Sequence, residues 1–107
     1  MIIHWKREKL REKVERHAAS NHITAKRMKS IQSAKSFPDL RPVSQGRAHF
    51  LNGEYEGCFA IDLEAKNNGK RLICIPRGDD LKKDGKKYIE ETIKELEIIE
   101  ISDHYKS

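Results

Sequence analysis

The fold of this chain is decided by the stretch GRAHFLNGEYEGCFAIDL, residues 46–63, which is followed by KRLICIP at 70–76 and ELEIIEIS at 95–102. Apolar residues alternate along 57–63, where Phe59, Ile61 and Leu63 share one face, and this two-residue period is typical of a strand. The continuous apolar run at 72–75 predicts a strand that is covered on both faces. Strands are therefore predicted at 46–51, 57–63, 70–76 and 95–102. Asn52-Gly53 predicts a tight hairpin turn between the first two, and 67–69 predicts the next turn.

Working outward from these strands, residues 77–87 are charged and predict an exposed excursion, and 88–93 predict a short helical turn. Residues 36–42 hold two prolines and predict a loop. Before this loop the pattern is helical, with helices predicted at 6–20 and at 24–35, the second capped by Thr24. Residues 1–5 predict a short edge strand. The sequence thus predicts one α+β domain over 1–107, in which an N-terminal helical hairpin packs on a largely antiparallel β-sheet.

Positive charge is concentrated in the predicted helical half. Residues 1–47 hold 12 Lys and Arg against 4 Asp and Glu, whereas the remainder holds 10 against 13. A basic face of this kind is typical of nucleic-acid binding, although a solvated basic surface has the same composition. No aromatic residue lies among the basic ones to stack on unpaired bases, which favours phosphate contacts over base contacts. The residues predicted to contact RNA are Lys9, Lys13, Arg16, Lys26, Arg27, Lys29 and Arg47.

The sequence also predicts the compartment and the absence of prosthetic groups. No apolar stretch approaches the roughly 20 residues that span a bilayer, and residues 1–5 are too short for the apolar region of a signal peptide. Cys58 and Cys74 do not form a disulfide framework and are predicted to be reduced core thiols. His4, His17 and His22 have no zinc-ligand spacing. We therefore expect a cytoplasmic protein without membrane association, metal or cofactor.

Three blocks in the second half resemble the HigB-type branch of the RelE/ParE toxin superfamily. Members of this branch typically carry His-x-Leu-x-Gly-Asp-Arg-x-Gly-x-Phe/Trp-x-Ile/Val, an Arg-Leu-Ile-Phe-x-Pro-like strand, and an ending near Glu-Ile-x-Asp-Tyr-His. The corresponding blocks here are residues 47–63, 70–76 and 97–105, which agree with the branch in order and spacing. The resemblance covers about half of the chain residue by residue.

The resemblance implies a toxin of a type II toxin-antitoxin system that cleaves messenger RNA on the ribosome and is held inactive by a cognate antitoxin, such as a small helix-turn-helix protein. Metal-independent RNA cleavage needs proton transfer, which suits histidine, and stabilisation of a phosphorane, which suits arginine. By the resemblance, the candidate catalytic residues are His49, Arg71, Asp103, His104 and Tyr105. Without it, His49 is an ordinary sheet histidine, Arg71 a strand-end residue and 103–105 a frayed tail.

The sequence departs from the family pattern at three places. Glu54-Tyr55 replaces Asp-Arg, Asn52 replaces a frequent Lys or Thr, and the imidazole and aromatic ring of His104 and Tyr105 are exchanged. Two alternatives to the ribonuclease therefore stay open, since a fold does not determine function: a gyrase poison like the ParE branch, or a catalytically weakened relative that binds RNA or the ribosome.

Overall fold

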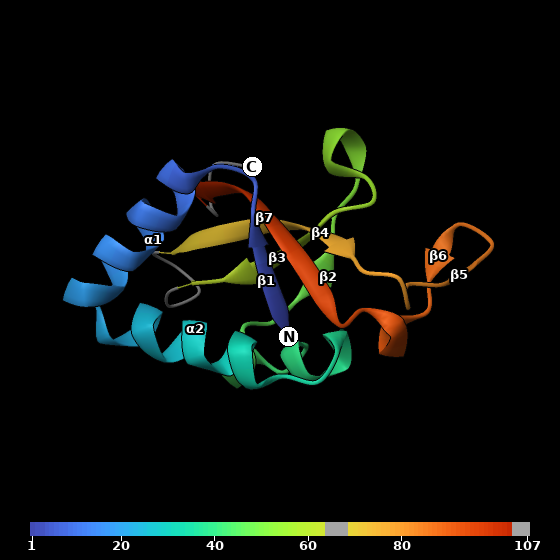
Figure 1. Ribbon diagram of the computed structural model, residues 1–107, viewed down its shortest axis with the longest axis horizontal. Coiled ribbons are helices and arrows are strands. Elements are labelled where there is room, and N and C mark those ends of the chain that lie inside the picture. Colours follow the sequence, from blue (N-terminus) through green and yellow to red (C-terminus); the bar gives the residue numbers. More distant parts are fainter. Residues whose placement is uncertain (64–68, 104–107) are drawn as a thin grey trace.

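The centre of the protein is a mixed five-stranded sheet in the order β1-β7-β4-β3-β2 (Figure 1). The computed structural model describes residues 1–63 and 69–103, with only the backbone of Asp103. β1 pairs in parallel with β7, and the other three pairings are antiparallel. The predicted α+β class and the edge position of the first strand are confirmed. The strands of this sheet are β1 (Ile2–Trp5), β2 (His49–Phe50), β3 (Phe59–Asp62), β4 (Lys70–Arg77) and β7 (Glu95–Asp103).

The two predicted helices form a hairpin against one face of the sheet. α1 spans Glu8–Ser20 and α2 spans His22–Ser33, so that only Asn21 separates them. Val14 of α1 and Ile31 of α2 are fully buried. They pack in one apolar cluster with alternate residues of the central strands: Phe59, Ile61, Leu72, Cys74, Leu96 and Ile98. In the described part of the chain, no helix has both the length and the apolar character needed to cross a membrane.

The N-terminus of α2 lies earlier than predicted, because Asn21 and not Thr24 caps it. The Asn21 side-chain oxygen accepts a hydrogen bond from the Thr24 backbone N–H at 3.0 Å. Thr24 lies inside the first turn, fully buried, and its hydroxyl donates to the Leu63 carbonyl at 3.5 Å. Either side chain could cap the helix, but Thr24 is buried against Leu63, so Asn21 is the residue that caps.

Replacing Asn21 by alanine is expected to lower the free energy of unfolding by about 1 kcal/mol, because the Thr24 N–H loses its acceptor. Urea denaturation followed by circular dichroism measures this loss. Ser20→Ala is the matched control, since the Ser20 hydroxyl only donates to the His17 carbonyl at the exposed end of α1. Equal stability of Asn21→Ala and wild type would contradict the assigned cap.

The strand predicted at 46–51 is shortened to His49–Phe50. Pro42 and the 3-10 helix η2 (Val43–Gln45) lead into Gly46 and Arg47, whose φ angles are +123° and +49°. These angles lie outside the β region, so the backbone cannot pair as a strand there. A Cβ at Gly46 would lie 2.7 Å from Cγ2 of Ile61, so this close approach requires glycine.

The predicted two-residue turn at Asn52-Gly53 is wrong. The Leu51 N–H donates to the Cys58 carbonyl, and the 3-10 helix η3 (Gly53–Tyr55) lies between them, so the connection is a wide loop. Residues 77–87 are exposed as predicted except for Leu81, which packs against the core, and this excursion leads through a small hairpin of β5 (Lys83–Asp84) and β6 (Lys87–Tyr88). The predicted helical turn is confirmed as η4 (Glu90–Thr92). The turn predicted at 67–69 lies outside the described residues except for Gly69.

The two free cysteines differ in their environment. Cys74 is fully buried, and burial raises the pKa of its thiol. Cys58 is only partly buried, so the prediction of a core thiol is confirmed for Cys74 and wrong for Cys58.

Candidate nucleic-acid interface

The face of the sheet opposite the helices carries the polar side chains of the central strands. Residues that are paired across a sheet project to the same side, and so do residues two apart along a strand. The register therefore places two adjacent rows of side chains on this face. One row is His49, Ala60, Ile73 and Glu100, and the other is Asp62, Arg71 and Ser102.

His49 lies on β2 at one end of the first row and is half-buried. Its Nδ1 lies 2.8 Å from the Arg47 carbonyl oxygen, which only accepts, so Nδ1 is the donor. In a neutral ring, Nε2 is then the unprotonated nitrogen. Nε2 makes no hydrogen bond to any described residue. The backbone of Arg47 thus sets the tautomer that a general base requires.

Asp62 holds the segment that orients His49. Its carboxylate accepts hydrogen bonds from Nε of Arg47 at 2.9 Å and from Nη2 at 3.4 Å, and its N–H donates to the Gly46 carbonyl. The Arg47 side chain is therefore engaged within the protein, and the structure gives it a positioning role in place of the predicted RNA contact. Asp62 is not among the site residues predicted from the sequence, where an acidic residue among the apolar residues of a strand is the available signal.

Arg71 lies on β4 in the second row and is half-buried. Its Nε donates to the Ser102 hydroxyl at 3.3 Å, while its two Nη nitrogens make no hydrogen bond to any described residue. Asp62, directly opposite on β3, is already paired with Arg47. The positive charge of Arg71 is therefore not neutralised by its nearest strand neighbour, and the outer edge of its guanidinium is left for an anion.

Tyr55 and Glu100 form a pair on the same face. The Tyr55 hydroxyl lies 2.8 Å from both oxygens of the Glu100 carboxylate and donates to it. This hydrogen bond is the main reason that the pKa of Tyr55 is raised, and the nearby charge of Arg71 opposes the shift. Tyr55 stands where the resembling family carries arginine, so this face holds a carboxylate and a neutral phenol near Arg71. The sequence analysis missed Glu100, whose position in a strand of alternating glutamates gave no specific signal.

His49 and Arg71 lie on alternate strands, separated by β3. Neighbouring strands are about 4.8 Å apart, so the β2 and β4 backbones are about 10 Å apart. Ala60 and Ile73 lie between them in the first row and are fully buried, so neighbouring side chains cover the middle of this face. His49 and Arg71 are each half-buried, so part of each side chain reaches the surface on this side. The arrangement places one imidazole and one guanidinium on a single face of the sheet.

The predicted tail contribution falls largely outside the described residues. Asp103 is the last residue of β7 and pairs with Lys70, and its side chain is not described. His104 and Tyr105 lie outside the described part of the chain, so their candidate roles stay predictions.

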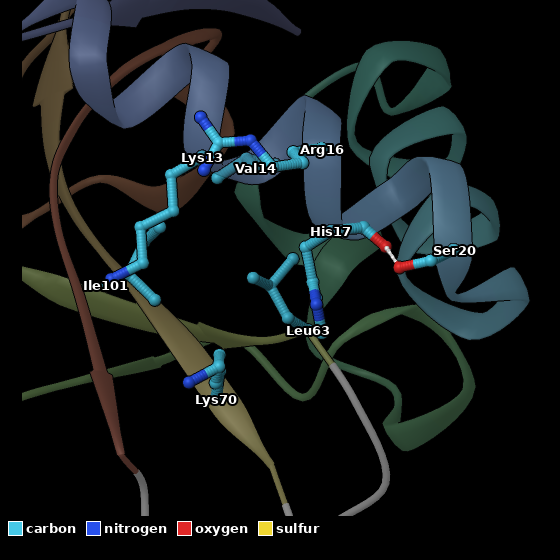
Figure 2. Close-up of a pocket in the computed structure, with 8 residues that line it drawn as sticks. All are labelled: Lys13, Val14, Arg16, His17, Ser20, Leu63, Lys70 and Ile101. Carbon is cyan, nitrogen blue, oxygen red and sulfur yellow. Dashed lines mark hydrogen bonds between the residues drawn. The ribbon is translucent and has the colours of Figure 1, made fainter.

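The predicted RNA-contacting residues of α1 are exposed, and two of them line a pocket. Lys13 and Arg16 project from α1 over the end of the sheet, where His17, Ser20 and Lys70 also line the pocket (Figure 2). Lys9 is exposed at the start of the same helix. On α2, Lys26 and Lys29 are exposed on a separate shallow surface. All five are exposed, and their contact with RNA stays a prediction.

Arg27 is placed differently from the other predicted RNA contacts. It is half-buried, its Nε is buried without a partner among the described residues, and one Nη donates to the Val43 carbonyl at 3.5 Å. Burial lowers the pKa of its guanidinium. Its side chain packs under Gly46, so it supports the segment that carries Arg47 and His49 and is not a free phosphate contact.

Within residues 1–63 and 69–103, no three His, Cys, Asp or Glu side chains are grouped in a way that would hold a metal ion. Comparison of the chain with models of protein families, with curated proteins and with solved structures gives no match.

Proposed function

We propose that this protein is the toxin of a type II toxin-antitoxin system and cleaves messenger RNA on the ribosome, as the HigB-type resemblance implies. The observation that carries the proposal is that His49 and Arg71 project to the same face of the sheet, where Nδ1 of His49 donates to the Arg47 carbonyl and neither Nε2 of His49 nor the Nη nitrogens of Arg71 have a described partner. Gyrase-binding relatives have no need of a proton-transfer histidine beside a phosphate-binding arginine.

In the proposed reaction, Nε2 of His49 removes the proton of a ribose 2′-OH, and the oxygen attacks the adjacent phosphorus. The charge of the resulting phosphorane is stabilised by Arg71, whose two Nη groups grip two of its oxygens. The leaving 5′ oxygen then needs a proton, for which Tyr105 and His104 are the candidates. Asp62 and Arg47 act through His49 by holding its acceptor in place.

The basic helical surface supports a ribosomal location for this reaction. Lys9, Lys13 and Arg16 lie on α1 and are exposed, so they can contact phosphates while the sheet face meets the messenger. The cognate antitoxin, for which a small helix-turn-helix protein is the expected type, would block one of these two surfaces.

Induced expression of the wild-type chain in bacterial cells is expected to stop growth within one generation and to produce new messenger-RNA 5′ ends, with DNA supercoiling unchanged. Sequencing of 5′ ends and plasmid topology gels measure the two effects. His49→Ala is expected to remove the new ends, since the loss of one acid/base group costs about 10²–10⁴-fold in rate. His22→Ala is the control, because His22 is exposed on α2, away from this face.

Three outcomes would contradict the proposal. Broken chromosomal DNA with intact transcripts would indicate a gyrase poison. Cleavage by His49→Ala at the wild-type rate would show that His49 has no role in the reaction. Growth arrest without any new 5′ ends would indicate that the protein binds the ribosome but does not cleave RNA.

A catalytically weakened, RNA-binding relative is the second candidate, and Glu100 favours it. Its carboxylate lies in the row adjacent to that of Arg71, where it repels a phosphate, and no arginine stands at Tyr55 to offset it. Under this alternative the chain co-sediments with ribosomes at full occupancy, while its cleavage is slow and is accelerated by Glu100→Gln.

A further inference from the structure

The pocket at the end of α1 is separate from the face that carries His49 and Arg71. It has a volume of about 270 Å³ and lies between the last two turns of α1, Leu63 just after β3, and the ends of β4 and β7. Lys13 and His17 project from the helix toward the sheet, Ser20 lies one turn further on with its hydroxyl on the His17 carbonyl, and Arg16 also lines the pocket (Figure 2). Lys70 faces them from β4. The pocket is thus built by side chains of α1, β4 and β7 together with Leu63.

The chemistry of the lining is that of an anion site with an apolar floor. Four of the eight described lining residues are basic, and none of the eight is acidic. Val14, Leu63 and Ile101 supply the apolar surface, against which the His17 ring lies beside Leu63. Cations that converge around an apolar surface favour a ligand with an anionic group attached to a flat or apolar body.

The pocket is adjacent to the candidate catalytic face through a single strand end. Lys70 and Arg71 are consecutive on β4, and strand neighbours project to opposite faces. Arg71 therefore faces the side of the sheet opposite the helices, while Lys70 faces the pocket. A polyanion that passes around the Lys70 end of β4 can therefore contact Arg71 on one face of the sheet and Lys70 on the other.

We propose that this pocket binds a phosphate ester as one nucleotide unit, with the phosphate near Lys13, Arg16 and Lys70 and the base or sugar against Leu63 and Ile101. The pocket volume of about 270 Å³ lies just below the roughly 300–1,000 Å³ of typical small-ligand sites, so it fits one nucleotide unit and no larger ligand. The nucleotide has two possible sources, a free mononucleotide or an RNA strand that continues around the edge from Arg71. The second source rests on the proposed function, whereas the first does not.

The test uses the full chain labelled with ¹⁵N, titrated with 5′-AMP, with adenosine, and with a five-residue RNA whose 2′-OH groups are methylated to prevent cleavage. Saturable amide shifts at Lys13, Ser20, Leu63 and Ile101 are expected for 5′-AMP and for the RNA. Adenosine is expected to bind at least about tenfold more weakly than 5′-AMP, because the charge-assisted contacts are lost.

The variants are Lys13→Ala and Arg16→Ala, each expected to weaken 5′-AMP binding about five- to tenfold. Lys6→Ala is the matched control: it removes the same charge just before α1, at a residue that does not line the pocket. Lys13 and Arg16 are exposed, and thermal unfolding of each variant checks that the fold is retained. Equal losses in Lys6→Ala and Lys13→Ala, equal affinity for adenosine and 5′-AMP, or shifts confined to the open sheet face would overturn the proposal.

The RNA and mononucleotide titrations distinguish the two sources. Similar affinities indicate a free-nucleotide site, and a much tighter RNA complex with a shift at Arg71 indicates a continuous strand; either supports the pocket. The pocket proposal and the proposed function can fail independently. If wild type cleaves messenger RNA but binds no ligand in the pocket, only the pocket proposal is contradicted. If the chain binds 5′-AMP but cleaves no RNA, only the proposed ribonuclease activity is contradicted.

Discussion

Replacing Arg71 by alanine is expected to lower the rate of messenger-RNA cleavage on the ribosome by about 10²–10³-fold, the usual cost of removing one group that stabilises transition-state charge. The phosphorane would lose the only cation on this face whose Nη nitrogens have no described partner. Single-turnover cleavage of a ribosome-bound messenger measures the rate. Arg71→Lys is expected to retain part of the activity, since it keeps the charge but loses the two-pronged grip on phosphate.

Arg77→Ala is the matched control for this variant. Arg77 lies on the same strand and the same face, but its guanidinium is held by Glu97 at the other end of β4. We expect wild-type cleavage from Arg77→Ala. Arg71 makes one 3.3 Å hydrogen bond to Ser102, so its removal is expected to cost no more than about 1 kcal/mol of stability. Cleavage by Arg71→Ala at the wild-type rate would contradict the proposed role of Arg71 in stabilising the phosphorane.

Replacing Phe37 by alanine is expected to lower the free energy of unfolding by about 3–5 kcal/mol. Phe37 is fully buried in η1 (Phe37–Leu40), with its ring stacked on Phe50 at 4.7 Å and edge-on to Phe59 at 5.0 Å. Alanine leaves a cavity between the helical layer and β2. Urea denaturation measures the loss, which is a large fraction of the roughly 5–15 kcal/mol that stabilises a domain.

Val43→Ala is the control, because Val43 is 68% exposed and its truncation is expected to change stability by less than about 0.5 kcal/mol. Phe37→Leu is expected to lie between the two, since it fills most of the cavity but loses the ring contacts. A loss below about 1 kcal/mol in Phe37→Ala would contradict the packing described for β2. Because β2 carries His49, Phe37→Ala is also expected to weaken cleavage before the whole protein unfolds.

The elements that the sequence predicted correctly are those with a long or regular apolar pattern. Residues 70–76 and 95–102 became β4 and β7 because their apolar runs are buried wherever they pack. The charged face of α1 and its narrow apolar stripe, with Leu10 and Val14 buried, likewise determined a surface helix. In these segments the local sequence pattern and the tertiary packing favour the same secondary structure, so the pattern alone is enough to predict it.

The short elements were decided by tertiary contacts. Asn21 and Thr24 have equal capping chemistry, and the contact of Thr24 with Leu63, 39 residues away, selects Asn21. Asn52-Gly53 favours a tight turn locally, yet the 3-10 helix that follows brings Tyr55 to Glu100, 45 residues away. Such contacts leave no periodic trace in the sequence.

For the candidate site, the sequence by itself determined which residue types were available: an imidazole at 49, a guanidinium at 71 and a basic N-terminal half. Only the tertiary structure decided their state. The sheet register brings His49 and Arg71 to one face, Asp62 pairs with Arg47 and not with Arg71, and the Arg47 carbonyl accepts the hydrogen bond of Nδ1 of His49. These contacts join residues that are distant along the chain and adjacent only after folding, so no local pattern predicts them.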